Sequence, residues 1–228
     1  RNAYSDDFDP LRHEAGVDFG FVPPGTALPG DADLIILPGT KATLADLAFL
    51  RAQGWDVDIA AHVRRGGRVL GVCGGYQMLG RTTSDPDGVE GVAGSASGLG
   101  LLDVETVLAG EKTLRQTSGR LAASDAAFAG YEIHIGQTRG PDTLRPFVRI
   151  NGQAHGAVSS NGRIAGLYIH GLFDQPEARA AILADLGALS NGVDQTQRLG
   201  RARDRILAGL ETHFDIAALS RIAGLSPV

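Results

Sequence analysis

A strand that runs directly into a glycine-framed cysteine, and then into a helix, most constrains the fold of this chain. The apolar residues Val69–Val72 directly precede Cys73, with Gly71 two residues before that cysteine and Gly74 directly after it. Residues 76–81 then follow a helical pattern. Small residues on both sides of the cysteine permit a tight strand-to-helix turn that exposes its side chain above a sheet. This order predicts an α/β fold with a site at the carboxyl ends of parallel strands.

The neighbouring segments continue this alternation of short strands and helices. Apolar runs bounded by Gly, Pro or Asp predict strands, and apolar residues at helical spacing predict helices between them. We expect the first two strands to be parallel. The expected strands are residues 17–22, 34–37, 68–72 and 164–169, and the expected helices are residues 43–50, 59–65 and 76–81.

A different pattern, rich in β-type residues and short polar turns, fills the stretch from Asp103 to Ile150. We therefore expect an α/β fold with a mostly parallel central sheet flanked by helices and a mixed or antiparallel extension. The whole chain, 1–228, is interpreted as a single domain in which 187–228 form a helical tail. Expected strands of the extension are 103–108, 114–121, 131–138 and 147–150, and later helices are 177–186, 196–210 and 216–224.

Composition excludes several classes of protein. The 228 residues carry 26 acidic and 21 basic side chains, and no basic stripe is present, which argues against a nucleic-acid or anionic-membrane partner. The apolar run Leu34–Pro38 is far shorter than the roughly 20 residues of a membrane helix. A single cysteine excludes an internal disulfide framework and a multi-cysteine metal site, and it favours a reducing compartment, by default the cytoplasm.

Cys73 is a candidate nucleophile because of its position on the glycine-framed turn. At the start of a helix the macrodipole favours thiolate over thiol, so the turn predicts a lowered pKa. The N–H of Gly74 would point toward the oxygen of an attacked carbonyl. Two alternatives are a small buried hydrophobic residue and a phosphate-binding loop, but Gly71–Gly80 lacks the Gly-Lys-Ser/Thr ending of a P-loop.

A thiolate nucleophile requires a general base, and imidazole suits that role at neutral pH. His170 follows the apolar run Ile164–Ile169 and would emerge at the same sheet edge as Cys73. His134 shares a strand face with Glu132, so the two either line a substrate pocket or form a hydrogen-bonded pair on the extension. The remaining histidines are interpreted as surface residues, and no His-rich cluster predicts a metal site.

The combination of several motifs resembles the triad-type glutamine amidotransferases, in the branch of the cobyric acid and cobyrinic acid a,c-diamide synthases. The resemblance covers residues 1 to about 186, and the opening stretch favours the glutaminase domain of cobyric acid synthases within that branch. The motifs that carry it are Asp6–Leu11 with Gly16-Val17, Leu37–Lys41, Gly71–Gly80, Gly98–Leu102, Gly130–His134 and Tyr168–Phe173.

This resemblance implies a mechanism. Cys73 would attack the side-chain amide of L-glutamine, His170 would protonate the leaving ammonia, and water would hydrolyse the glutamyl thioester. The backbone N–H groups of Gly39 and Gly74 would form the oxyanion hole. Gln77 matches a position that contacts bound glutamine, and its alternative is a polar residue on the helix surface.

The resemblance also implies partners outside this chain. An N-terminal ATP-binding synthetase domain, with ATP and Mg²⁺, would activate carboxylates of adenosylcobyrinic acid a,c-diamide, which the released ammonia converts to amides. No nucleotide-binding signature or metal site is expected here, so this chain carries no cofactor of its own. Because it opens on Arg1 and not on methionine, we expect the C-terminal part of a longer polypeptide.

One feature departs from the wider triad group, in which a glutamate follows the histidine by two residues. Here that position is Leu172, and the nearest acid is Asp174, so we expect a Cys–His pair whose imidazole is oriented by a backbone carbonyl. Three alternatives stay open. The acceptor could be that of a cobyrinic acid diamide synthase or of a cell-wall amidotransferase, and the chain could be a non-catalytic α/β interaction module.

Overall fold

The strand that precedes Cys73 is the central strand of a small sheet. In the computed structural model, which describes residues 5–224, β2 (Arg68–Val72) pairs in parallel with β1 (Leu34–Leu37) and with β12 (Ile164–Leu167). β11 (Ala157–Val158) pairs antiparallel with β12 and completes the order β1-β2-β12-β11. The predicted α/β class, with parallel strands leading to Cys73, is therefore confirmed.

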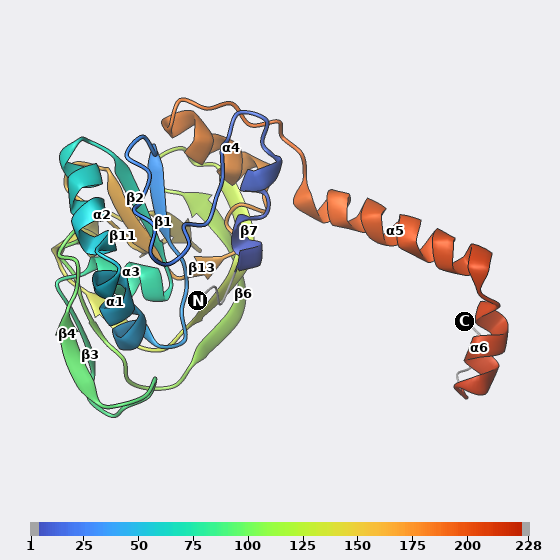
Figure 1. The fold of residues 1–228 in the computed structure, drawn as a ribbon, viewed down its shortest axis with the longest axis horizontal. Helices are drawn as coiled ribbons and strands as arrows, with labels where there is room; N and C mark the ends of the chain where they lie inside the picture. Colours follow the sequence, from blue (N-terminus) through green and yellow to red (C-terminus); the bar gives the residue numbers. More distant parts are fainter. Residues whose placement is uncertain (1–4, 225–228) are drawn as a thin grey trace.

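Both faces of this sheet are buried, which explains why its strands are continuously apolar. Along β2, Val69 belongs to one hydrophobic cluster, whereas Leu70 and Val72 belong to the other. The cluster that holds Val69 also contains buried side chains of α1 (Thr43–Ala52), α2 (Trp55–Arg64) and α3 (Gly74–Leu79). These helices cover one face of the sheet (Figure 1).

The predicted extension is present, but it divides into two sheets. In the larger one every neighbouring pair of strands is antiparallel, and its last strand carries His170. Its order is β10 (Gln153–His155), β9 (Val148–Ile150), β6 (Thr113–Leu121), β7 (Ala127–His134) and β13 (Ile169–His170). The smaller, mixed sheet has the order β4 (Gly94–Ser97), β3 (Thr82–Asp85), β5 (Glu105–Val107) and β8 (Gln137–Arg139).

The remaining helices lie at the N-terminal and C-terminal ends of the chain. The second hydrophobic cluster packs against α4 (Pro176–Asp185) and against the N-terminal segment, where Phe8 and Leu11 are buried. Beyond α4 the chain forms α5 (Gln195–His213) and α6 (Ile216–Ile222), which project away from the body (Figure 1). Three short 3₁₀ helices are η1 (Ser5–Phe8), η2 (Leu11–His13) and η3 (Pro141–Leu144). The ends of the expected single domain, 1–4 and 225–228, lie outside the described residues.

The expected strand at residues 17–22 does not form. This segment is assigned to no strand, and its alternate residues Val17 and Phe19 instead pack over the cluster that holds Leu70. Phe19 stacks on Phe8 and contacts Phe21 edge to face. Its alternation of apolar residues therefore reflects aromatic packing of an extended cover segment and not pairing in a sheet.

Candidate active site

Cys73 occupies a strained backbone position at the junction of β2 and α3. Its φ of 53° and ψ of −115° lie in a region that residues with a side chain rarely adopt, at a cost of about 1–3 kcal/mol. Glycine at position 75 makes the turn possible, because a Cβ atom there would lie 2.0 Å from the carbonyl oxygen of Leu37 on β1. The strand-to-helix turn predicted from the sequence, which we call the elbow, thus brings α3 close to the neighbouring strand, β1.

The nucleophile candidate is buried between strands of two different sheets. Its side chain is 7% exposed, and its thiol donates a hydrogen bond to the carbonyl oxygen of Ile133 on β7, at 3.2 Å. Its backbone N–H donates to the carbonyl oxygen of Leu167 at the end of β12, at 2.8 Å. The antiparallel extension therefore forms one wall of the site and the parallel sheet forms another.

His170 lies against the same strand of the extension. It is fully buried, it pairs with Tyr131 across the β7–β13 ladder, and its ring stacks on the Tyr131 ring with centroids 5.1 Å apart. Tyr131 is two residues from Ile133, the residue that binds the Cys73 thiol. The structure therefore brings the predicted nucleophile and the predicted base to one stretch of β7.

A carboxylate that the sequence analysis did not assign orients this histidine. The Nδ1 atom of His170 lies 2.6 Å from Oδ2 of Asp7, and the backbone N–H of Gly171 donates to Oδ1 of Asp7 at 3.1 Å. Because an ionised carboxylate can only accept, Nδ1 carries the proton, and Nε2 is the basic nitrogen of the neutral ring. The expectation that a backbone carbonyl suffices is therefore wrong, since a buried aspartate takes that place.

Asp7 was not found because it lies 163 residues before His170 in the sequence. The acidic run that contains it was noted only as part of a family motif. The sequence signal for its role is an acidic residue close to the apolar residues Phe8 and Leu11. Both of these side chains are buried, so the segment that carries Asp7 packs into the core. Asp174, the acid nearest to His170 in sequence, is half-buried, and burial raises its pKa to about 6, with the Asp7 charge as the second cause.

The electrostatics of Cys73 differ from the expectation. Burial raises the pKa of the thiol to about 12, although a hydrogen bond from the N–H of Gly74 lowers it in part. The carboxylates of Glu90 and Asp7 raise this pKa further, and Lys112 opposes them. The predicted lowering of this pKa is therefore wrong, because burial favours the neutral thiol, and a thiolate would form only if a base removes the proton.

Glu90 reaches the site from the loop after β3. Its Oε2 atom accepts a hydrogen bond from the backbone N–H of Thr43, the first residue of α1, at 2.6 Å. Buried Asp85 holds this loop, because its two carboxylate oxygens accept from the N–H groups of Val89 and Glu90 at 2.7 and 2.9 Å. A negative charge is thus fixed at the start of α1, near the nucleophile.

Gln77 is a buried residue and not a surface residue, although it lies one helical turn after Cys73. Its side chain is 2% exposed, and its Nε2 donates to the carbonyl oxygen of Ile135 at 3.1 Å and to the Tyr168 hydroxyl at 3.3 Å. Its Oε1 accepts from the hydroxyl of Thr43 at 2.9 Å. The amide of Gln77 therefore connects α3 to both walls of the site.

His134 forms the hydrogen-bonded pair that was one of its two interpretations. Its Nε2 lies 2.9 Å from Oε1 of Glu132, whose other oxygen forms an ion pair with Arg115 at 2.6 Å. The ring also stacks on Tyr168, with centroids 3.8 Å apart, and Tyr168 contacts Gln77. The two residues predicted to bind substrate thus share a neighbour.

The loop after β1 lies directly against the elbow. Gly39 follows this strand, and a Cβ atom on Gly74 would lie 3.2 Å from the backbone nitrogen of the next residue, Thr40. The Thr40 hydroxyl donates to the carboxylate of Asp46, which fixes the loop to α1. The two glycines proposed for an oxyanion hole therefore lie on adjoining turns.

Two kinds of feature are absent from residues 5–224. They contain no group of three or more His, Cys, Asp or Glu side chains arranged to hold a metal ion. Across the same residues, no helix combines the length and the apolar composition needed to cross a lipid bilayer.

Comparisons with known proteins point to one family. The model of the CobB/CobQ-like glutamine amidotransferase domain matches residues 1–178. A cobyric acid synthase of Caulobacter sp. (strain K31) is 64% identical over 99% of this chain, and one of Cereibacter sphaeroides is 54% identical over 98%. The chain spans only about half of these relatives, 46% of each.

Two solved structures share the fold. A crystal structure of a glutamine amidotransferase has a TM-score of 0.50 at 15% sequence identity, covering 68% of this chain and 80% of its own. The structure of PurLQS from Thermotoga maritima has a TM-score of 0.52 at 18% identity, covering 80% of this chain and 85% of that one.

Proposed function

Because this chain belongs to the CobB/CobQ-like glutamine amidotransferase family, we propose that it is the glutaminase part of a cobyric acid synthase. In this proposal it releases ammonia from L-glutamine, and a companion ATP-dependent half uses that ammonia to amidate carboxylates of adenosylcobyrinic acid a,c-diamide. The observation that carries the proposal is the hydrogen bond between Asp7 and His170, together with a strained cysteine that contacts β7, the strand with which His170 pairs. A cysteine retained only for packing requires neither.

In the first step, Sγ of Cys73 attacks the side-chain carbonyl carbon of glutamine while Nε2 of His170 accepts the thiol proton. This proton transfer is needed because burial keeps the pKa of the thiol high. The Asp7 carboxylate stabilises the imidazolium that forms and holds its ring orientation. The N–H groups of Gly39 and Gly74 stabilise the negative charge on the carbonyl oxygen.

In the second step, the imidazolium donates its proton to the amide nitrogen, the C–N bond breaks, and ammonia leaves a glutamyl thioester on Cys73. Water, deprotonated by the same imidazole, then attacks the thioester carbon, and glutamate and the free thiol are released. In this proposal Gln77 and the His134–Glu132 pair shape the glutamine pocket from the α3 and β7 sides through their shared neighbour Tyr168. Each turnover converts one glutamine and one water into one glutamate and one ammonia.

ATP and Mg²⁺ act on the companion half in this proposal. The steps proposed for this chain use only its own side chains and backbone N–H groups. The single cysteine of the chain suits a reducing compartment, and we propose the cytoplasm as its location.

The proposal is tested by glutamate release from glutamine, measured for the unaltered chain and for Cys73→Ala. We expect release only from the unaltered chain, and mass spectrometry at low pH should detect a glutamyl adduct on Cys73. The isolated chain should be a slow glutaminase that its companion half stimulates. Equal release by both proteins, or none even when the chain is joined to a companion half, would contradict a glutaminase.

A further inference from the structure

The two C-terminal helices expose apolar side chains in a regular pattern. Leu199, Ile206 and Leu210 lie on one face of α5, because their spacings of seven and four residues each complete whole turns. Leu207 borders this face, and α6 extends it. We call the exposed set the apolar stripe: Leu199, Ile206, Leu207, Leu210, Phe214, Ile216, Leu219 and Ile222, each between 41% and 84% exposed.

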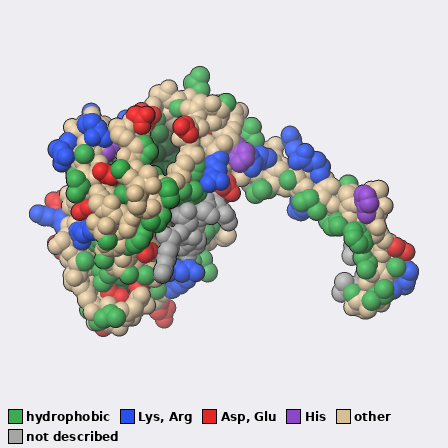
Figure 2. Space-filling model, in the orientation of Figure 1, with side chains coloured by type: hydrophobic (Ala, Val, Ile, Leu, Met, Phe, Trp, Pro, Cys, Tyr) green, Lys and Arg blue, Asp and Glu red, His purple; other side chains and the backbone are tan. Residues whose placement is uncertain are grey.

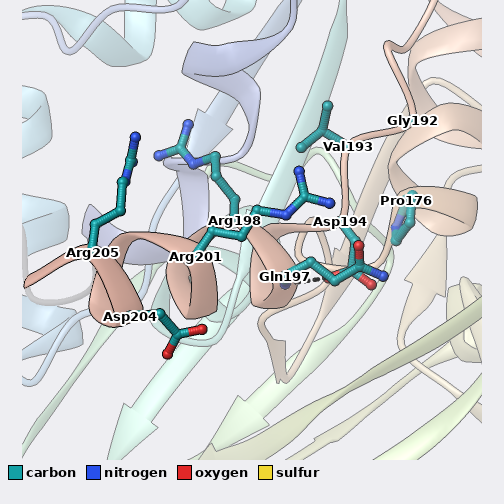
Figure 3. Close-up of a pocket in the computed structure, with 9 residues that line it drawn as sticks. All are labelled: Pro176, Gly192, Val193, Asp194, Gln197, Arg198, Arg201, Asp204 and Arg205. Carbon is teal, nitrogen blue, oxygen red and sulfur yellow. Dashed lines mark hydrogen bonds between the residues drawn. The ribbon is translucent and has the colours of Figure 1, made fainter. Parts of the chain in front are cut away.

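A row of arginines lies on the other side of α5, roughly opposite the stripe. Arg198, Arg201 and Arg205 are spaced by three and four residues and form one basic face, which we call the arginine row. Figure 3 shows their side chains on one side of the helix, around a hollow that Pro176 and Val193 also line. Figure 2 shows hydrophobic and basic side chains next to one another along this projecting part of the molecule.

The base of α5 is firmly attached to the domain. Arg179, which is 1% exposed, donates to the carbonyl oxygens of Phe173 and Val193 at 2.7 and 2.5 Å. It also pairs with Glu14, whose carboxylate accepts from the N–H of Asn191 at 2.6 Å. Since the chain leading into α5 is fixed in this way, a partner bound to α5 would be oriented relative to the domain as a whole.

We propose that the apolar stripe forms the docking surface for the companion half of a cobyric acid synthase, an inference that rests on the proposed function. The relative from Caulobacter sp. aligns with 226 residues of this chain, so its matched region includes both helices, and more than half of its length lies outside the match. The occupant is therefore a folded synthetase half with an apolar groove for the stripe and a carboxylate for Arg203, which lies within the width of the stripe.

Charge and shape argue against two other occupants. A second copy of the chain would bury Arg203 of each copy between the paired stripes, where the α5 stripe offers no carboxylate to face it, which opposes a symmetric helix pair. A lipid surface is flat, but α5 and α6 meet at an angle after Phe214 (Figure 1), so their apolar residues do not lie in one plane. The stripe also contains no tryptophan and includes Arg203 within its width.

The test uses a chimera in which this whole chain replaces the matching region of the Caulobacter sp. cobyric acid synthase. Hydrogen exchange of residues 195–222 is compared between the chimera and the chain alone. We expect the α5 amides to exchange at least tenfold more slowly in the chimera. The double variant Ile206→Glu/Leu210→Glu should lose this protection, and its glutamine-driven amidation should fall at least tenfold, while ammonium-driven amidation and glutamate release by the chain alone stay unchanged.

The matched control is Ala208→Glu/Thr212→Glu, which adds two glutamates at the same spacing on the opposite face of α5. It should retain both protection and glutamine-driven amidation. Equal exchange in the chimera and the chain alone would overturn the docking surface. So would concentration-dependent protection in the chain alone, which indicates a second copy, or stripe-dependent binding to phosphatidylglycerol vesicles without protection in the chimera. Loss of glutamate release with protection intact would overturn only the proposed function.

Discussion

The turn that carries Cys73 and the segment that carries Asp7 present side chains to the same site, but different contacts hold them. The turn is determined locally, because glycines within three residues of Cys73 allow α3 to approach β1. The Asp7 segment is held by partners distant in sequence: Gly171 for its carboxylate and Arg179, through Glu14, for the segment that follows. Local sequence can therefore specify a nucleophile, while tertiary packing supplies the residue that orients its base.

The largest effect is expected at His170, on which both regions converge. In the proposed mechanism His170→Asn removes the base for the thiol and the acid for the leaving ammonia, so we expect glutamine hydrolysis to fall by at least about 10³-fold. Amidation driven by added ammonium should continue in a chimera with a companion half. The measurement is glutamate release against ammonium-driven product, and loss of both would indicate misfolding.

Asp7→Asn tests the contribution of the Asp7 segment alone. The amide can donate to Nδ1 and favour the wrong tautomer, a change that costs about 10⁴-fold in a serine triad. We expect about 10²-fold here, because a thiol gives up its proton more readily than a hydroxyl. The control, Asp174→Asn, should cost less than tenfold in kcat/KM, and a larger loss in Asp174→Asn than in Asp7→Asn would contradict the assignment.

The Asp174 variant also has a pH-dependent effect on stability. Since the native pKa of Asp174 is raised to about 6, its favourable contribution is present below about pH 4 and is lost as pH rises through 6. Asp174→Asn should therefore raise the urea midpoint of unfolding at pH 8 relative to the unaltered chain. The difference should vanish near pH 4, and the opposite trend would show that Asp174 is stabilised as an anion.

Breaking the buried ion pair tests how the Asp7 segment is held. Arg179→Met leaves the Glu14 carboxylate buried without its partner, so we expect a loss of about 3–5 kcal/mol in the free energy of unfolding. Adding Glu14→Gln should recover part of that loss. Urea unfolding measures both, and additive losses in the double variant would mean that the two residues act independently.

The smallest effect is expected at Glu90, whose charge acts on the thiol of Cys73. Because this carboxylate raises the pKa of Cys73, Glu90→Gln should lower that pKa and increase alkylation of the thiol several-fold at a fixed pH. Alkylation of the unaltered chain should rise about tenfold per pH unit between pH 7 and 9, because ionisation is still incomplete there. Iodoacetamide labelling at Cys73 measures both, and slower labelling of the variant would reverse the sign of the interaction.

Local features could be predicted from the sequence, but contacts between residues far apart in the chain could not. The central strands and the elbow follow from residues adjacent in the chain, and strands form at 34–37 and 68–72 as expected. The expected strand 164–169 instead divides into β12 and β13, which belong to different sheets, because the chain leaves the parallel sheet after Leu167 to pair with β7. The strand expected at 17–22 failed because alternation of apolar residues does not reveal whether a pairing partner exists. The high pKa of Cys73 was missed for a similar reason: its main cause is burial by strands that come from far along the chain.

The strained backbone at Cys73 predicts how this position should change during evolution. Its φ of 53° suits glycine better than any residue with a side chain, so the fold alone gains nothing from a cysteine there. A lineage released from selection for glutamine hydrolysis should drift toward glycine at this position and become more stable as it does. The identity of one residue would then distinguish descendants that still perform the chemistry from those that retain only the scaffold.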